Sequence, residues 1–147
     1  MKLVPSFVVA FSTIAVLAAC QTDSREQALL VTKSQVELRS FQSRAFDTND
    51  REKTLRTIIA TLQDLSFVVD KADATLGSVS ATKFGSGDMG SPYQLKMTVS
   101  VRPRNKDQLI VRANAQYNIV AVEDPEPYQH FYTALSKAMF LTAHNVD

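Results

Sequence analysis

The most constraining feature of this sequence is a strict alternation of apolar and polar residues in two neighbouring stretches. Over 95–102, Leu, Met and Val alternate with Lys, Thr, Ser and Arg, and 109–117 follow the same period. A period of two places successive side chains on opposite faces of a strand. The two stretches therefore predict strands with one buried face and one largely wet face. Residues from Pro103 to Asp107 predict the turn between them, and 119–122 are expected to prolong the second strand.

Shorter segments are also typical of strands. Residues 36–46 alternate imperfectly, which indicates an edge strand or a bulge. Residues 67–69 and 78–84 predict a second hairpin, with 70–76 as its connection. Three of the four glycines fall in 85–92. We expect this segment to be a flexible hairpin connection, and a loop that binds a partner is the alternative.

One segment between these strands carries apolar residues at helical spacing. It predicts a helix over about 50–65. Residues 47–50 offer several N-cap candidates, and among them Asn49, with Glu52 three residues on, resembles a capping box. Charged and amide side chains occupy the opposite face. A single stripe of this kind packs one face of a helix against a core. Its members are Leu55, Ile58, Ile59, Leu62 and Leu65.

The C-terminal segment predicts a second helix over about 125–143. Asp124 is a capping residue, Pro125 suits the first turn, and Glu126 lies near the positive end of the helix dipole. Phe140 falls off the main stripe, which indicates either burial on two sides of the helix or contact with a partner. The stripe itself consists of Tyr128, Phe131, Leu135, Ala138 and Met139.

The order of the predicted elements is β-α-β-β-β-β-α. Each helix has one apolar face to bury, and the strands have one apolar face to offer. The sequence therefore predicts an α+β fold, a two-layer sandwich in which two helices cover one face of an antiparallel sheet of about five strands. We expect five aromatic residues to belong to the core: Phe41, Phe84, Phe131, Tyr132 and Phe140.

The N-terminus has the pattern of a secretory leader. Lys2 supplies a positive charge, and residues 3–19 contain no charged residue. This run is at the short end of the ~20 residues needed to cross a bilayer, and small residues precede its end. The pattern predicts a signal peptide over 1–19. An uncleaved membrane anchor is the alternative.

The only cysteine, Cys20, closes the apolar run, directly after Leu17-Ala18-Ala19. These four residues resemble the lipobox of bacterial lipoproteins. The resemblance implies that Leu17, Ala18 and Ala19 form the recognition site of the lipoprotein signal peptidase. It also implies that Cys20 carries a diacylated thiol and an acylated amine, with palmitate as a typical chain. Gln21, in place of aspartate, implies sorting to the outer membrane, with the domain on its periplasmic face. An ordinary signal peptide followed by a free thiol is the alternative.

Cleavage at this site leaves residues 20–147. Of these, 20–34 are largely polar and predict a tether behind the lipidated cysteine, and 35–147 predict a single domain. The full chain has 16 Lys and Arg against 15 Asp and Glu, and the excess charge belongs to Lys2 in the leader. A balanced charge argues against a nucleic-acid partner, which requires a basic excess. One cysteine excludes an internal disulfide and a multi-cysteine metal site.

Few side chains are available for catalysis or metal binding. His130 and His144 are about 21 Å apart along a helix, too far to ligate one metal ion. No nucleophile-elbow, phosphate-loop or zinc-protease motif is present, so we expect no catalytic residue, no metal and no cofactor beyond the covalent lipid. Arg102, Arg104 and Lys106 lie at the predicted hairpin turn, with Arg112 further along, and could contact anionic head groups, peptidoglycan or an acidic partner. A solvated turn is the alternative.

Five short phrases are distributed along the predicted domain: RSFQSRAF at 39–46, LQDLSF at 62–67, VSVRP at 99–103, DPEPYQ at 124–129 and LSKAMFL at 135–141. Together they resemble a family of small lipoproteins of Gram-negative bacteria. The resemblance covers nearly the whole mature domain and implies an envelope location, without implying an activity. Ser66 departs from the pattern, which has glycine there, and the stretch between Tyr117 and Asp124 is shorter.

Three classes of function follow from these arguments. The anchor, the tether and the lack of catalytic motifs favour a non-enzymatic lipoprotein that binds a protein partner, as an accessory subunit of an envelope transport, secretion or assembly complex. A domain that binds a lipid, a glycan or a small molecule is the alternative, and it requires a sizeable apolar pocket between sheet and helices. An enzyme, the least favoured class, would require converging polar side chains in a cleft.

Overall fold

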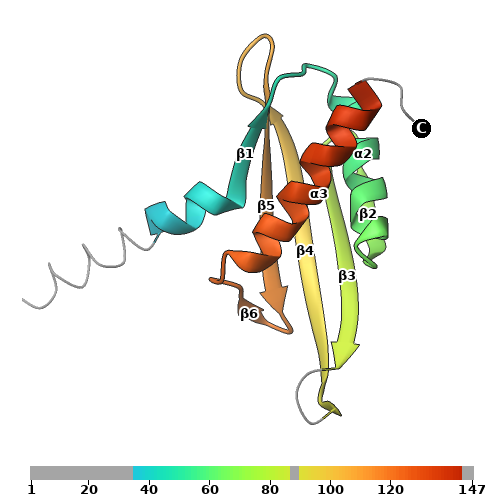
Figure 1. Ribbon diagram of the computed structural model, residues 1–147, viewed down its shortest axis with the longest axis vertical. Coiled ribbons are helices and arrows are strands. Elements are labelled where there is room, and N and C mark those ends of the chain that lie inside the picture. The colour runs from blue at the N-terminus through green and yellow to red at the C-terminus, as the bar shows by residue number, and fades with distance from the viewer. Residues whose placement is uncertain (1–34, 87–89, 144–147) are drawn as a thin grey trace, which may run out of the picture. The chain divides into compact units, whose positions relative to one another are not determined.

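The computed structural model describes residues 35–86 and 90–143. The strands are β1 (Ser43–Phe46), β2 (Val68–Asp73), β3 (Ser78–Ser86), β4 (Pro92–Pro103), β5 (Leu109–Tyr117) and β6 (Val120–Ala121), and the helices are α2 (Arg51–Asp64) and α3 (Glu126–Ala143). Residues 35–42 are also helical. The strands form one antiparallel sheet in the order β1-β5-β4-β3-β2, and β6 also pairs with β5 (Figure 1).

The long strands β3, β4 and β5 carry the alternation of the sequence into the sheet. Val99 on β4 lies opposite Val79 on β3 and Ala113 on β5, and all three side chains are buried. Thr98, one residue earlier, lies opposite Ser80 and is exposed. One face of the sheet is therefore apolar and covered, and the other is polar and open, as the period of two requires.

Both helices cover the apolar face of the sheet (Figure 1). Helix α2 packs against β2, β3 and β4, and α3 packs against β5 and against α2. The core between the layers contains fully buried side chains from both, including Ile58, Leu62, Val99, Phe131 and Leu135. The fold is thus an α+β two-layer sandwich with an antiparallel sheet and two helices on one face, as expected.

Helix α2 starts at a different cap from the one expected. The N-cap is Asp50, whose Oδ1 accepts a hydrogen bond from the backbone nitrogen of Lys53 at 2.9 Å. Asp50 is one of the candidates in 47–50, but the capping box at Asn49 was wrong, because Asp50 is the residue placed to reach the third backbone N–H of the helix. The helix also buries three hydroxyls that were not part of the predicted stripe. Each donates to the carbonyl oxygen four residues earlier, and they belong to Thr54, Thr57 and Thr61.

Two tyrosines of α3 bond backbone groups of β5 on the edge where β1 and β6 pair with it. β1 pairs with Leu109–Arg112 and β6 with the last two residues of β5, which leaves a gap between them. In this gap the Tyr132 hydroxyl accepts a hydrogen bond from the nitrogen of Ala113 at 3.2 Å. The Tyr128 hydroxyl accepts one from the nitrogen of Ala115 at 3.1 Å. Two side chains of the helical layer therefore take the place of a strand.

The prediction of one strand over 36–46 was wrong. Residues 35–42 are helical, and only Ser43–Phe46 are extended. The partly buried residues Leu38, Phe41 and Gln42 are three and four positions apart, which is the spacing of one helical face. The imperfect alternation therefore reflects a change from helix to strand, since no single period describes both.

Strand β2 is longer than the predicted 67–69 and continues to Asp73. Its pairing with β3 shifts register between Val69 and Lys71, which makes Asp70 a bulge. The Asp70 carboxylate accepts a hydrogen bond from the Thr82 hydroxyl at 2.7 Å. The sequence did not reveal the full length of β2, because the bulge interrupts its period of two and its second half is largely polar.

The prediction that 119–122 prolong β5 was also wrong. Asn118 has a φ of 54°, a left-handed conformation that asparagine adopts more readily than most residues. Its backbone nitrogen donates to the carbonyl oxygen of Gln94 at 2.7 Å, and its Oδ1 accepts from the Gln94 nitrogen at 3.1 Å. The chain therefore reverses, and β6 pairs with the end of β5.

Of the five aromatic residues expected in the core, Phe131 and Tyr132 are buried and Phe41 packs against the core from its edge. The prediction was wrong for Phe84 and Phe140, which are 70% and 63% exposed. Phe84 lies opposite Gln94 on the open side of the sheet. Phe140 lies off the apolar stripe of α3, as its position in the sequence indicated.

Candidate functional site

An open groove of about 500 Å³ lies between β1, the start of α2 and the last turns of α3. Its apolar lining comes from β1 and α3 and includes Ala45, Phe46, Met139 and Phe140. Phe46 and Met139 pack partly against the core, whereas most of the Phe140 side chain is exposed. The groove is therefore an apolar surface that the fold leaves open to solvent.

Arg44 fixes a positive charge in the wall of this groove. Its Nη1 donates to the carbonyl oxygen of Tyr132 and to the hydroxyl of Ser136, both at 3.2 Å. The guanidinium carbon lies 5.0 Å from the centre of the Tyr132 ring, within the range of a cation–π contact. These contacts hold β1 against α3 and keep the cation in place, with other guanidinium donors to offer to an anion.

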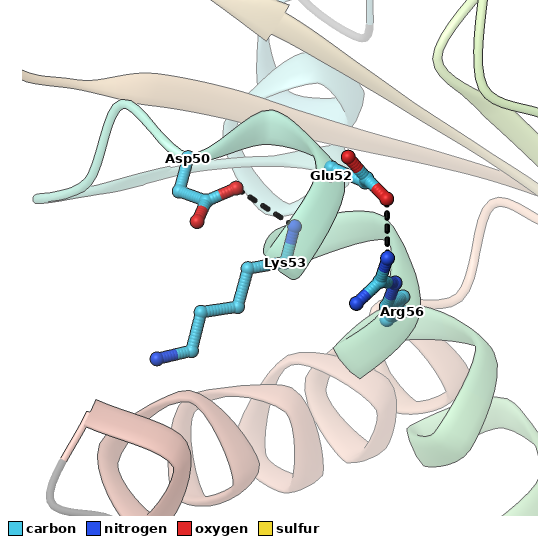
Figure 2. Close-up of polar contacts among 4 residues, drawn as sticks. All are labelled: Asp50, Glu52, Lys53 and Arg56. Carbon is cyan, nitrogen blue, oxygen red and sulfur yellow. Dashed lines mark hydrogen bonds and ion pairs between the residues drawn. The ribbon is translucent and has the colours of Figure 1, made fainter.

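The start of α2 adds charged side chains beside the groove. Figure 2 shows Asp50 holding the backbone nitrogen of Lys53, and Glu52 paired with Arg56 one turn along the helix. Lys53 points away from the Glu52–Arg56 pair and lines the groove together with Thr54. The Glu52–Arg56 pair is exposed on both sides, so it contributes little to stability.

The cations predicted to contact an anionic surface do not enter the groove. Arg104 and Lys106 lie in the exposed turn between β4 and β5, and Arg102 lies on β4. The turn is held by a hydrogen bond from the backbone nitrogen of Arg104 to the carbonyl oxygen of Gln108 at 2.9 Å. The Gln108 amide in turn bonds the carboxylate of Asp47, which lines the groove. The turn is therefore tied to the rim of the groove but faces solvent.

The structure adds Lys96, which the sequence reasoning did not single out, and places it on the same face as Arg112. Lys96 and Arg112 are exposed and lie on the same open face of the sheet as Arg102. In the sequence they occur in different strands, yet they hold the same polar positions of the alternation as Arg102. That alternation, combined with the strand pairing, was the signal that could have placed them together.

A smaller cavity of about 250 Å³ lies near the start of α3, beside the end of β3, the start of β4 and the end of β5. Tyr93 and Tyr117 form part of its wall, in an edge-to-face contact with ring centres 5.7 Å apart. Burial, and then the nearby Tyr93, raise the pKa of Tyr117. Exposed His130 also borders it. Within 35–86 and 90–143 no group of three His, Cys, Asp or Glu side chains could hold a metal ion.

The remaining predicted residues, Leu17, Ala18, Ala19 and Cys20, lie outside the described residues, as does His144. In the described part of the chain, no helix combines the length and the apolar character needed to cross a bilayer.

No protein-family model and no curated protein matches this chain. Among solved structures, this chain shows a weak likeness to a DUF4468 family protein from Bacteroides ovatus. The two chains are 9% identical, and the match covers 71% of this chain and 83% of the other with a TM-score of 0.32.

Proposed function

We propose that this protein is a lipid-anchored lipoprotein of the outer membrane whose periplasmic domain binds a protein partner, as a non-enzymatic accessory subunit of an envelope complex. The lipobox at Leu17–Cys20 supports the anchor. The groove between β1, α2 and α3 supports the partner.

The observation that carries the proposal is the exposure of Phe140 beside Met139 and Arg44 in one groove. Aromatic residues, methionine and arginine are the types enriched where proteins bind one another. Covering an exposed phenylalanine with a partner removes its apolar surface from water and so favours binding. The fixed cation of Arg44 adds a site for an acidic side chain of that partner. The groove therefore suits a chain segment with apolar residues and a carboxylate.

The alternative, a lipid, glycan or small-molecule site between sheet and helices, has less support. Small-molecule sites bury most of their ligand. Here the space between the layers is filled by fully buried side chains such as Ile58, Phe131 and Leu135. The groove lies at the edge of the domain and is open, which favours a protein segment over an enclosed ligand.

The experiment places a photo-crosslinking phenylalanine at position 140 of the full chain in cells. The matched control places it at Phe84, an equally exposed phenylalanine on the open side of β3. We expect irradiation to join position 140, but not position 84, to one envelope protein. A second variant, Ser136→Trp, fills the groove and should abolish the product while the domain keeps its circular dichroism spectrum.

Each other outcome contradicts the proposal. Equal products at positions 140 and 84, or a product that survives Ser136→Trp, would show that the groove is not the contact. A product with the mass of a lipid or another small molecule, and none with a protein, would favour the alternative.

A further inference from the structure

We infer that the open face of the sheet docks on the anionic phospholipid head groups of the membrane. The inference rests on the anchoring part of the proposed function, because an anchored domain stays close to that surface. It concerns the face of the sheet opposite to the helices, which is separate from the groove.

The charge of this face is one-sided over β1, β3, β4 and β5, and β2 carries the only acidic residues among the described residues of the face. β4 contributes Lys96 and Arg102, and β5 contributes Arg112. Nothing on the outward positions of β1, β3, β4 and β5 carries a negative charge. Among the described residues no carboxylate forms an ion pair with any of these three cations. The adjoining turn adds Arg104 and Lys106.

The acidic residues at the edges of this face are engaged locally. Asp70 accepts the hydrogen bond from Thr82 at 2.7 Å, and Asp73 accepts one from the backbone nitrogen of Leu76 at 2.8 Å. Both lie on β2, at the far edge of the sheet from β1. Both carboxylates keep their negative charge, but β3 separates them from β4, so the positive charge of the face is concentrated on β4 and β5.

The size of the face matches a membrane surface. Lys96 and Arg102 are six residues apart on one strand, a separation of about 20 Å at the rise of a β-strand. Arg112 lies on the neighbouring strand, opposite Ser100. Cations spread this far apart can contact several head groups at once, whereas a single small anion could reach only one of them.

The chemistry between the cations favours phosphate over a protein surface. The outward side chains there are hydroxyls and amides, which can donate hydrogen bonds to phosphate oxygens: Ser80, Thr98, Ser100, Asn114 and Gln116. Protein interfaces are built on buried aromatic and other large anchors. The exposed large apolar residues of this face, Val68 and Phe84, lie at the β2 edge and the far end of β3. Head groups can be bound without such anchors, because each Lys or Arg near the surface raises the affinity about fivefold.

The test uses the acylated full chain in vesicles of phosphatidylcholine with and without about one-third phosphatidylglycerol. Cys20 is the only cysteine, so after acylation the variant Thr98→Cys carries the only free thiol for a fluorescent label. The control, Ala60→Cys, places the label on the exposed side of α2. We expect the anionic lipid to shield the label at 98, but not at 60, from a water-soluble quencher. Salt at about 1 M, where the Debye length is about 3 Å, should abolish the shielding.

Charge variants complete the test. Replacing Lys96, Arg102 and Arg112 by glutamine should weaken docking roughly a hundredfold, at about fivefold for each cation. The matched variant, with Arg39, Arg56 and Lys137 replaced by glutamine, should dock normally.

The inference is wrong if the chain stays anchored and the label at 98 remains as accessible as that at 60. It is also wrong if both vesicle types shield position 98 equally, or if shielding requires added envelope proteins, which would indicate an acidic protein partner. Failure of the chain to stay with either vesicle type contradicts the anchoring instead.

Discussion

The hydroxyl oxygen of Tyr132 lies 3.2 Å from the backbone nitrogen of Ala113, so a helix side chain closes a gap in the edge of the sheet. The hydroxyl hydrogen faces two carbonyl oxygens, those of Gln42 at 2.7 Å and Val111 at 2.9 Å. Because Tyr132 is almost fully buried, these backbone groups cannot turn to water instead. The tyrosine thus links α3, β5 and the residue before β1.

We expect Tyr132→Phe to lower the free energy of unfolding by about 1–3 kcal/mol, since it leaves a buried N–H and a carbonyl oxygen without partners. Tyr128→Phe should act similarly through the nitrogen of Ala115 and the carbonyl oxygen of Val122. Tyr117→Phe is the control and should change stability by less than about 0.5 kcal/mol, as at other exposed sites. Urea unfolding followed by circular dichroism measures all three. Equal losses at positions 117 and 132 would contradict the role of the sheet gap.

The same tyrosine predicts a pH dependence at high pH. Burial raises the pKa of Tyr132 well above its usual value, although the hydrogen bond from Ala113 and the positive charges of Arg44 and Arg112 act in the opposite direction. Above about pH 10 the unfolded chain releases this proton while the folded chain keeps it. The free energy of unfolding should therefore fall as the pH rises above about 10, and be unaffected by this group below it. Urea unfolding between about pH 9 and 11 should show a shallower decline in Tyr132→Phe; identical slopes would rule out this contribution.

Ser66 occupies a position that favours glycine. Its φ is 65°, and it ends α2 in a Schellman motif, with hydrogen bonds of 2.9 Å from its nitrogen to the oxygen of Gln63 and from the Phe67 nitrogen to the oxygen of Leu62. We expect Ser66→Gly to raise the free energy of unfolding by about 0.5–1 kcal/mol, because relief of the left-handed strain exceeds the added entropy of the unfolded chain. Asn118→Gly, also at positive φ, should give no gain, since it loses the bond to Gln94. A loss of stability in Ser66→Gly would refute this explanation.

Gly77 is required for two reasons that a control can separate. Its φ is +69°, and a Cβ there would lie 2.2 Å from Nη2 of Arg51, which donates to the oxygen of Thr75 at 2.9 Å. Gly77→Ala should therefore cost roughly 2–3 kcal/mol, from backbone strain and loss of the Arg51 bond. Gly90 has a φ of +75°, but a Cβ there would have no described atom within 4 Å. Gly90→Ala should therefore cost only the backbone strain, about 1–2 kcal/mol. Thermal or urea unfolding of both variants provides the comparison, and equal costs would mean that Arg51 moves freely.

The proposed lipid anchor predicts a defined response to globomycin, which blocks the lipoprotein signal peptidase. Treated cells should accumulate the precursor that retains residues 1–19, and Cys20→Ser should prevent acylation. Labelling with a radioactive fatty acid and gel electrophoresis measure both. The mature protein should remain with the membranes during a high-salt wash, and its release would contradict the anchor.

Local periodicity was sufficient for most of the fold. The alternation of β4 and β5 and the stripes of α2 and α3 depend on each residue's preference for water or the core, which is visible in any window of the sequence. Sequence reasoning failed at 35–46, at β2 and after Asn118, where a helix meets a strand, a bulge interrupts the period, and a turn reverses the chain. In each case the hydrophobic period changes within a few residues, and so short a segment is not long enough to reveal a period of its own.

The sequence by itself determined the two layers, the open and covered faces of the sheet, and the position of Phe140 off the stripe of α3, whereas its exposure was decided by the structure. Only the tertiary structure decided which residues meet. The groove joins Ala45, Lys53 and Met139 from three separate elements, and Lys96 and Arg112 join Arg102 on one face through strand register. The Tyr132–Ala113 bond exists only because β1 and β6 leave a gap between them. Each of these is a contact between distant segments, and its geometry depends on packing rather than on the preference of any single residue.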